Sequence, residues 1–188
     1  PSIGGIGLLA NYKKMITMEL KNNGNYLFVI GKTEGHLDQS VFARNILSKF
    51  EGPPPEVNLF NEKQNGLIIL NLINNNLIET CHDVSLGGIL TALSKMSIKG
   101  NKGINIFPIN GLVNKFQYFF GEDQGRYIIE IKQENLENVE KILKNDSIHF
   151  DKLGLIEGNE INYGSDLKIS IDDIKQGYKK WLSEYMVN

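Results

Sequence analysis

Apolar residues recur at two different spacings along this chain, and the order of these spacings restricts the folds it can adopt. Short apolar runs such as 26–30 are typical of buried strands. They alternate with segments whose apolar residues lie three or four apart, as in helices. After residue 145 the alternation stops, and three strands are predicted in succession, at 149–156, 160–163 and 167–169. We therefore predict an α+β fold, a mixed β-sheet with helices packed on it, rather than a doubly wound parallel sheet.

The other predicted elements lie between and around these strands. Further strands are expected at 77–84, 103–107 and 126–131, and helices at 38–50, 56–73, 87–98, 134–144 and after Ser170. Three prolines follow Gly52 and separate the first two helices, because proline lacks an amide donor and restricts the residue before it. Ser170 can cap the last helix. One face of that helix carries Ile174, Tyr178, Trp181, Leu182 and Tyr185.

The composition indicates a globular domain and excludes several functional classes. The chain has 188 residues without an evident repeat or linker, so we predict that 1–188 form a single domain. A net charge of −2 gives no reason to expect nucleic acid or a membrane surface as a partner. The single cysteine, Cys81, rules out an internal disulfide and fits a reducing compartment, so we expect the cytoplasm. The chain begins with Pro1 rather than Met, which suggests an interior position in a longer protein.

Several apparent catalytic motifs fail when their structural context is considered. Gly31, Lys32 and Thr33 resemble the end of a phosphate-binding loop, but Tyr26 stands where that motif needs glycine. The glycines at 5–7 match a dinucleotide fingerprint but leave no room for the strand that must precede it. Adjacent Cys81 and His82 would point to opposite faces of a strand and cannot form a dyad. The three histidines are scattered, so we predict neither a metal site nor a catalytic residue.

Two loops carry the residues that we consider candidates for ligand binding. The first contains His82, Asp83, Ser85, Gly87 and Gly88 before a predicted helix, whose free amides could bind phosphate. Its alternative interpretation, which we favour on physical grounds alone, is a tight connection with His82 and Asp83 bonded locally.

The second loop lies between two glycines just before the predicted strand 126–131. It contains Glu122, Asp123, Gln124 and Arg126, which together suit a polar, hydroxyl-rich ligand. Its alternative interpretation is a solvated loop with a Glu–Arg pair, which is the more common outcome for such a sequence.

Read together, these loops and four other segments resemble a known family. The segments are 1–9, 30–37, 39–40, 52–59, 77–88 and 120–127. In this order they resemble the C-terminal domain found throughout the superfamily of aminoimidazole ribonucleotide synthase. Within that superfamily they are most similar to phosphoribosylformylglycinamidine synthases of the small type, the synthetase subunit. The resemblance covers about the first two-thirds of the chain, and no motif is evident beyond Ile131.

The resemblance implies a role within a larger ATP-dependent carbon–nitrogen ligase. Such a synthase carries two tandem pairs, each an ATP-binding domain followed by a domain like this one. It uses ATP, magnesium and glutamine-derived ammonia to convert formylglycinamide ribonucleotide to the amidine in purine biosynthesis. The general base and principal metal ligands belong to the ATP-binding domains, so the isolated chain is expected to be inactive. The implied partners are those upstream domains, a glutaminase subunit and a small bridging subunit.

The resemblance also gives the second loop a specific expected role. Glu122, Asp123 and Gln124 correspond to a Glu-Ser-Gln substrate loop in the first copy of the domain. The proline segment favours the second copy, where the loop and Arg126 would line a pseudo-symmetric, non-catalytic nucleotide site. Leu86 replaces an acid of the family pattern, which argues against metal binding by the 82–88 loop, and Asp38 replaces a common glycine.

Two other readings remain open from the sequence. The chain could be a free-standing module that binds nucleotides or phosphorylated sugars, as the glycine loop before a helix allows. It could also be the matching domain of another superfamily member, such as aminoimidazole ribonucleotide synthase, selenophosphate synthetase or thiamine-phosphate kinase.

Overall fold

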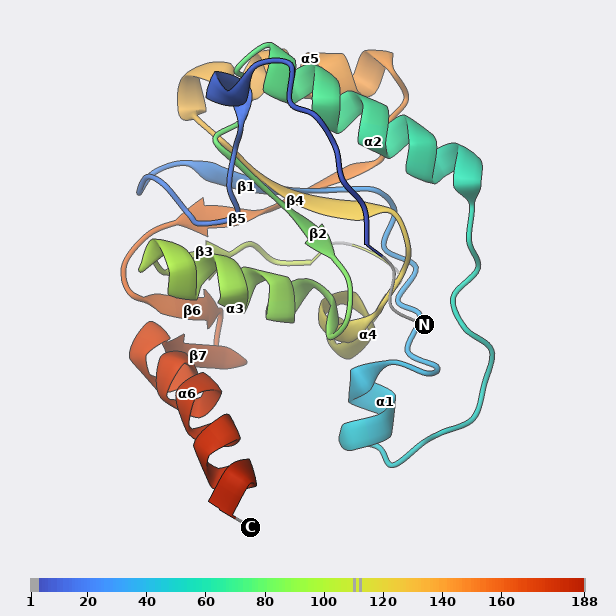
Figure 1. Ribbon diagram of the computed structural model, residues 1–188, viewed down its shortest axis with the longest axis vertical. Helices are drawn as coiled ribbons and strands as arrows, with labels where there is room; N and C mark the ends of the chain where they lie inside the picture. The colour runs from blue at the N-terminus through green and yellow to red at the C-terminus, as the bar shows by residue number, and fades with distance from the viewer. Residues whose placement is uncertain (1–3, 110, 112, 188) are drawn as a thin grey trace.

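A mixed β-sheet runs through the molecule (Figure 1). The computed structural model describes residues 4–109, 111 and 113–187, so Pro1, Ser2 and Ile3 of the first resembling segment lie outside the described residues. In the described chain the sheet has seven strands, in the order β2-β4-β1-β5-β3-β6-β7. Neighbouring strands are antiparallel except β3 and β6, which are parallel. The strands are β1 (Tyr26–Ile30), β2 (Thr80–Val84), β3 (Ile104–Ile106), β4 (Arg126–Ile131), β5 (Phe150–Ile156), β6 (Glu160–Tyr163) and β7 (Leu167–Ser170).

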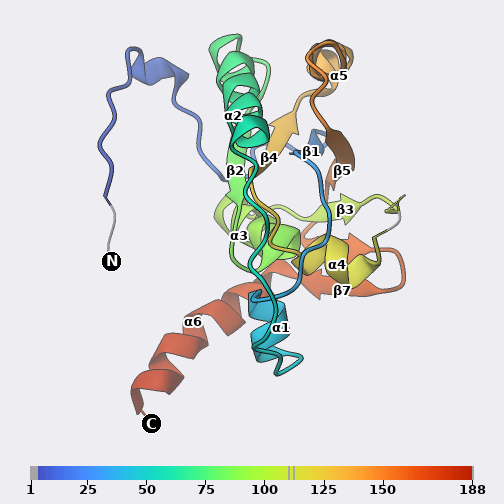
Figure 2. The same cartoon turned by 90° about the vertical axis from the view of Figure 1, so that its right-hand side faces the viewer.

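Helices cover both faces of this sheet, and Figure 2 shows α2 and α5 at the top of the view with α3 and α4 below. The α-helices are α1 (Val41–Asn45), α2 (Leu59–Asn74), α3 (Gly88–Gly100), α4 (Lys115–Phe120), α5 (Leu136–Asn145) and α6 (Ile171–Val187). Two short 3-10 helices are η1 (Tyr12–Lys14) and η2 (Gln133–Asn135). The predicted α+β architecture, a mixed sheet with helices packed on it, is confirmed.

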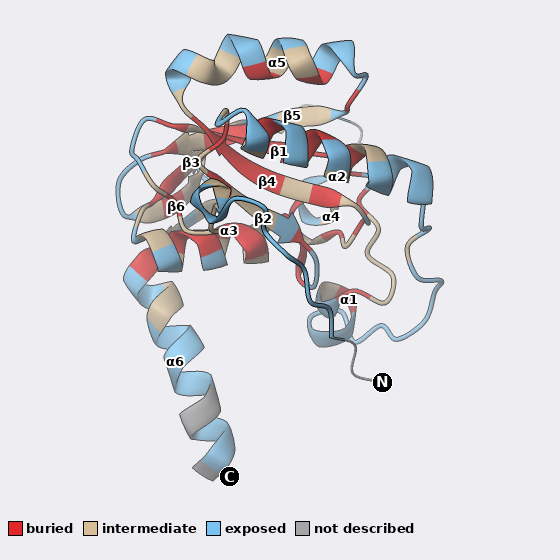
Figure 3. Ribbon diagram, turned by 45° about the horizontal axis from the view of Figure 1, so that its top comes forward, coloured by how far each residue is buried: buried red, intermediate tan, exposed pale blue. Residues whose placement is uncertain are grey.

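The middle position of β1 explains why its sequence is apolar throughout. Successive side chains of a strand point to opposite faces of the sheet. Leu27 and Val29 join the core cluster under α3 and α4, whereas Phe28 and Ile30 join the cluster under α2 and α5. All four are fully buried, as Figure 3 shows for the centre of the sheet. A strand covered by helices on both faces needs an uninterrupted apolar run, and this chain supplies one.

The structure corrects the prediction of a long helix at 38–50. Only α1 is helical there, and it begins where Ser40 Oγ accepts a hydrogen bond from Ala43 N at 3.0 Å. Gln39 and Ser48 have positive φ values of 62° and 52°, a conformation that breaks a right-handed helix on both sides. The Gln39 amide instead donates to the carbonyls of Phe50 and Gly52, which fixes the start of the proline segment.

Several other predicted boundaries differ from the structure, and one helix was missed. β2 begins at Thr80 rather than at 77, and α2 begins only at Leu59, after the cap formed by Asn58. The missed helix is α4, which a capping box of Asn114 and Gln117 starts. Its signal was available in the sequence, because an Asn followed three residues later by Gln before an apolar run is typical of a helix start.

A buried carboxylate on β4 anchors the segment that leads into β1. Glu130 is fully buried, and its two oxygens accept hydrogen bonds from Lys21 N (2.9 Å), Asn22 N (3.0 Å) and Asn25 Nδ2 (2.7 Å). Burial raises the pKa of Glu130 above 4.5, and the three donors oppose this only in part.

We expect this carboxylate to make folding stability depend on pH. Because the pKa of Glu130 is higher in the folded state, its protonated form favours folding; that contribution is complete below pH 4.5 and is lost as pH rises through the folded pKa. Glu130→Gln removes this titration. It also places an amide NH2 group, itself a donor, among three hydrogen-bond donors, so it destabilises the chain. The stability difference from the original chain should therefore shrink as pH rises from about 4 to 7. Urea unfolding over this range measures it, with Glu137→Gln as the surface control. A difference that grows with pH would contradict the expectation.

Candidate functional site

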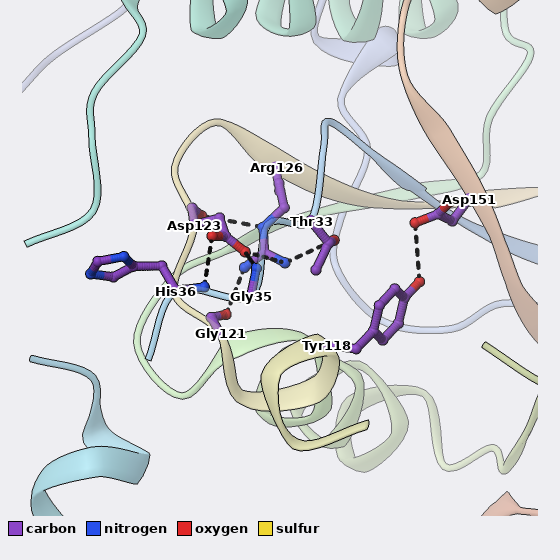
Figure 4. A network of polar contacts seen from close by, with 8 residues as sticks. All are labelled: Thr33, Gly35, His36, Tyr118, Gly121, Asp123, Arg126 and Asp151. Carbon is purple, nitrogen blue, oxygen red and sulfur yellow. Dashed lines mark hydrogen bonds and ion pairs between the residues drawn. The ribbon is translucent and has the colours of Figure 1, made fainter. Parts of the chain in front are cut away.

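The loop after β1 and the loop before β4 meet around the Asp123 carboxylate (Figure 4). Its two oxygens accept hydrogen bonds from the backbone amides of Gly35 and His36, each at 3.0 Å. Gly35 has φ +77°, which favours glycine, and this conformation presents two consecutive amides to one carboxylate. Asp123 is only 7% exposed, so it binds its own chain rather than solvent.

Arg126 occupies the interior of the same network. Its guanidinium donates to the carbonyls of Asp123 (3.2 Å) and Gly121 (2.7 Å) and to Thr33 Oγ1 (3.1 Å). The Asp123 carboxylate lies 3.5 Å from the same group. Burial lowers the pKa of Arg126, and the neighbouring carboxylate opposes that shift. The alternative interpretation of this loop expected a solvated Glu–Arg pair, but the ion pair observed is Asp123–Arg126 and it is buried.

Glu122 joins the two candidate loops that the sequence singled out. Its Oε1 accepts hydrogen bonds from Val41 N and from Gly87 N, each at 2.8 Å. Its own amide donates to the carbonyl of His36 at 2.9 Å. Glu122 thus holds the start of α1 and the turn before α3 through its carboxylate, and the loop after β1 through its backbone amide. A carboxylate from the chain itself occupies a position beside the α3 N-terminus that the sequence suggested for phosphate.

The remaining residues of the 82–88 loop form the tight connection of the alternative interpretation. His82 Nδ1 lies 3.1 Å from Asp83 Oδ1, so these two side chains are bonded locally. Gly87 caps α3, and no side chain completes this cap. Ser85 is exposed and its carbonyl accepts from Gly88 N at 3.0 Å. Gly88 has φ +70°, and a Cβ there would lie 2.6 Å from the Phe119 carbonyl oxygen.

Gln124 differs from its neighbours because its side chain is exposed at the edge of a large groove. The groove encloses about 1290 Å³ between the loop after β1, the proline segment with the start of α2, and the α5–β5 connection. Its lining includes six side-chain amides, which can both donate and accept hydrogen bonds, together with six acidic residues and two lysines. The amide residues are Asn58, Asn61, Gln64, Asn65, Gln117 and Gln124. Sequence reasoning identified Gln124 but missed the other five. Four of them lie in or just before α2, which approaches the loop only in the folded chain, and Gln117 lies on α4, which was not predicted.

Groups for metal binding or nucleophilic catalysis are not assembled in the described part of the chain. Residues 4–109, 111 and 113–187 contain no cluster of three or more His, Cys, Asp or Glu side chains that could hold a metal ion. Burial raises the pKa of the Cys81 thiol to about 12, so it stays protonated near neutral pH. Within the same residues, no helix combines the length and apolar character needed to cross a membrane.

The fold and the loop network define a recognised class of domain. Residues 22–163 match the family described as AIR synthase related protein, C-terminal domain. This match covers most of the chain, which therefore belongs to that family.

Comparison with individual proteins shows which members of the family this chain is similar to. Over 188 residues the chain is 58% identical to the phosphoribosylformylglycinamidine synthase subunit PurL of Pelagibacter ubique. Over 186 residues it is 37% identical to the corresponding subunit of Bartonella henselae. It spans about a quarter of their length, 26% and 25% respectively. The structure of T. maritima PurL complexed with FGAR aligns with 87% of this chain and 30% of its own, with a TM-score of 0.70 and 16% identity, and supports the fold.

Proposed function

We propose that residues 1–188 form one domain, the C-terminal domain of a phosphoribosylformylglycinamidine synthase. The observation that carries this proposal is the 58% identity to a PurL subunit over the whole chain. The parent enzyme would use ATP and glutamine-derived ammonia to convert formylglycinamide ribonucleotide to formylglycinamidine ribonucleotide. ATP would phosphorylate the amide oxygen, and ammonia would then displace the phosphate to form the amidine. This reaction belongs to de novo purine biosynthesis, and we place the enzyme in the cytoplasm.

In this proposal the chain itself supplies no catalytic residue. The general base and most ATP contacts belong to upstream ATP-binding domains of the same polypeptide. Magnesium does not fit the two candidate loops, because Leu86 is apolar and the carboxylates of Glu122 and Asp123 are engaged with backbone amides. We therefore assign the metal to the ATP-binding domains as well. A glutaminase subunit and a small bridging subunit would complete the synthase.

We further propose that the domain is the second of two copies and lines a non-catalytic nucleotide site. Gln124 is the loop residue available to a ligand, since it is exposed beside the groove. Glu122, Asp123 and Arg126 would act indirectly, by fixing the loop that carries Gln124. The groove has room for a nucleotide, and its amides match the donors and acceptors of ribose and base.

An activity assay tests the assignment of function. The 188-residue chain, with substrate, ATP, magnesium and ammonia, should release no ADP above background. The longer polypeptide that carries it should release ADP only when the ribonucleotide is present. Substrate-dependent ADP release by the 188-residue chain, after removal of contaminants, would overturn the assignment of catalysis to other domains. No release by the longer polypeptide would overturn the synthase assignment.

A substitution in the groove tests the proposed nucleotide site. In the longer polypeptide, Gln124→Ala should weaken ADP binding at this site about 2–10-fold, the effect of losing one hydrogen bond. Calorimetric titration measures the affinity, and Gln133→Ala, an exposed glutamine in η2, is the matched control. Equal affinity of both variants and the original polypeptide would remove Gln124 from the site. Tight ADP binding by the 188-residue chain alone would instead favour a free-standing binding module.

A further inference from the structure

The two lysines that line the large groove are both paired within this chain. Lys32 lies 2.6 Å from Glu34, and Lys49 lies 2.7 Å from Asp38. A carboxylate this close offsets most of the positive charge that a more distant anion would feel. These lysines therefore attract the phosphates of a ligand only weakly.

The two histidines of the lining also face acceptors of the chain. His36 Nε2 lies 3.0 Å from the Pro53 carbonyl oxygen, and His149 Nε2 lies 3.9 Å from a carboxylate oxygen of Asp151. Every basic side chain of the lining, all of which the structure describes, thus has an acceptor beside it. The groove offers a phosphate group no unpaired cation.

Carboxylates supply the remaining charge of the groove. Asp123 is neutralised by Arg126 and by two backbone amides. Within the described chain no ion pair involves the other three acids of the lining, all exposed: Glu56, Glu62 and Asp146. Ionised carboxylates only accept hydrogen bonds, so they repel phosphate and suit a ligand that brings donors. The hydroxyls of a ribose are such donors, and an Asp or Glu binds them in dinucleotide sites.

Asn65 adds an acceptor whose orientation the structure fixes. This residue lines the groove and is only 7% exposed. Its Nδ2 donates to the Gly125 carbonyl oxygen at 2.9 Å, and because a carbonyl only accepts, Oδ1 is the amide atom left over. Among the described residues no donor is recorded for this oxygen. A buried amide oxygen of this kind suits an amino group of a ligand, such as the exocyclic amine of adenine.

Phe60 gives the groove an aromatic surface. It belongs to the lining, lies in the first turn of α2 and is 70% exposed. Every nucleobase has a flat face that can stack on such a ring. Leu59, the residue before it, is similarly exposed at 75% but lies outside the lining, so exposure alone does not place a side chain in the groove.

We propose that the groove binds the nucleoside end of the nucleotide and excludes its phosphates. The base stacks on Phe60 and donates its amino group to Asn65, and the ribose hydroxyls donate to the free carboxylates. The phosphates lie outside the groove, where the upstream domains hold them. The candidate loops fit this arrangement, since the Glu122 carboxylate already occupies the position beside the α3 N-terminus that a phosphate could take. This inference rests on the proposed nucleotide site and adds its direction and the class of base that it prefers.

Photolabelling of the longer polypeptide with 2-azido-ADP, followed by peptide mapping, locates the base. Label should enter the peptide that contains 58–65. Phe60→Ala should lower the affinity read from this labelling about 5–100-fold, the effect of losing one stacked ring. Leu59→Ala removes an apolar side chain outside the lining and should change the affinity less than about twofold. Label confined to other peptides, or equal affinity in both variants, would overturn the placement of the base.

Competition against the same label tests where the phosphates lie. Neutralising a carboxylate strengthens the binding of a nearby phosphate but not of a nucleoside, so the ratio of ADP affinity to adenosine affinity reports their proximity. Glu62→Gln and Asp146→Asn should keep this ratio within about twofold of that of Glu137→Gln, an exposed acid of α5 outside the lining. A rise of about fivefold or more in either groove variant would place the phosphates inside the groove and refute the proposal.

Purine riboside, which lacks the amino group of adenosine, tests the role of Asn65. It should compete about 2–10-fold less well than adenosine in the original polypeptide, and equally well in Asn65→Ala. Equal competition in the original polypeptide would remove Asn65 from recognition of the base. Substrate-dependent ADP release by the same preparation separates these tests from the proposed function. Turnover with an unlabelled groove refutes the nucleoside site and keeps the synthase, and a labelled groove without turnover does the reverse.

Discussion

Replacing Arg126 with methionine is expected to lower the free energy of unfolding by about 3–5 kcal/mol. The change removes the cation beside the Asp123 carboxylate, which is only 7% exposed. It also leaves the carbonyl of Gly121 and the hydroxyl of Thr33 without their recorded donor. Methionine fills much of the volume but donates no hydrogen bond, so the loss is electrostatic rather than a cavity effect. Urea unfolding followed by circular dichroism measures the change.

Two further variants separate this explanation from a general intolerance of substitution. Arg126→Lys keeps the positive charge but cannot reproduce three hydrogen bonds from one planar group, so an intermediate loss is expected. Arg44→Met removes an exposed arginine that donates to Gln39, and its effect should stay within about 1 kcal/mol. If Arg126→Met were as mild as Arg44→Met, the buried network would not be the element that fixes this loop.

The second large effect is expected at the turn before α3. Gly88→Ala should destabilise the chain by about 2–4 kcal/mol, because a left-handed backbone and a steric overlap add together. The added Cβ would lie 2.6 Å from the Phe119 carbonyl oxygen and 2.8 Å from that of Gly121. Both are backbone atoms at the end of α4, so they cannot rotate away as a side chain could. Thermal and urea unfolding should both report the loss.

The same substitution at another glycine provides the control. Gly66 lies inside α2, and the nearest atom to an added Cβ is the Tyr127 hydroxyl oxygen at 3.9 Å. Alanine fits there and favours a helix, so Gly66→Ala should stabilise the chain by about 0.5–1 kcal/mol. Opposite signs for the two variants would support the steric argument, and a neutral Gly88→Ala would refute it.

The sequence predicted those parts of the fold whose local signals agree with their final surroundings. β1, β4 and β6 were predicted at their observed bounds because apolar runs and glycines mark them directly. The 38–50 helix was wrong because its apolar spacing continues, while the left-handed backbone at Ser48 ends α1 early. Nothing in a single sequence reports that conformation for a serine. At 38–50 helix propensity gave the wrong prediction, because tertiary contacts determine the backbone conformation there.

At the candidate site, too, the sequence indicated which residues to consider but not what each of them binds. Glu122, Asp123 and Arg126 form hydrogen bonds that fix one loop, with Gln124 between them in sequence, but their partners could not be predicted. Ligand binding by these four residues stays a prediction. The amides of Gly35, His36 and Gly87 come from segments 35 or more residues away. A polar residue that binds a ligand and one that binds a distant backbone amide look identical in sequence. In this loop the structure shows that Asp123 and Arg126 are buried among their own chain's backbone groups, whereas Gln124 is exposed.

The central place of β1 in the sheet has a consequence for how the chain is made. β1 pairs on both sides with strands far downstream, β4 and β5, so neither edge can be satisfied early in synthesis. At a ribosome speed of about 5–20 residues per second, its apolar run waits roughly 6–25 s for both partners to emerge. During that interval two unpaired strand edges and four core side chains are open to other nascent chains. Expression of the chain should therefore depend on chaperone supply and temperature more than its folded stability would suggest.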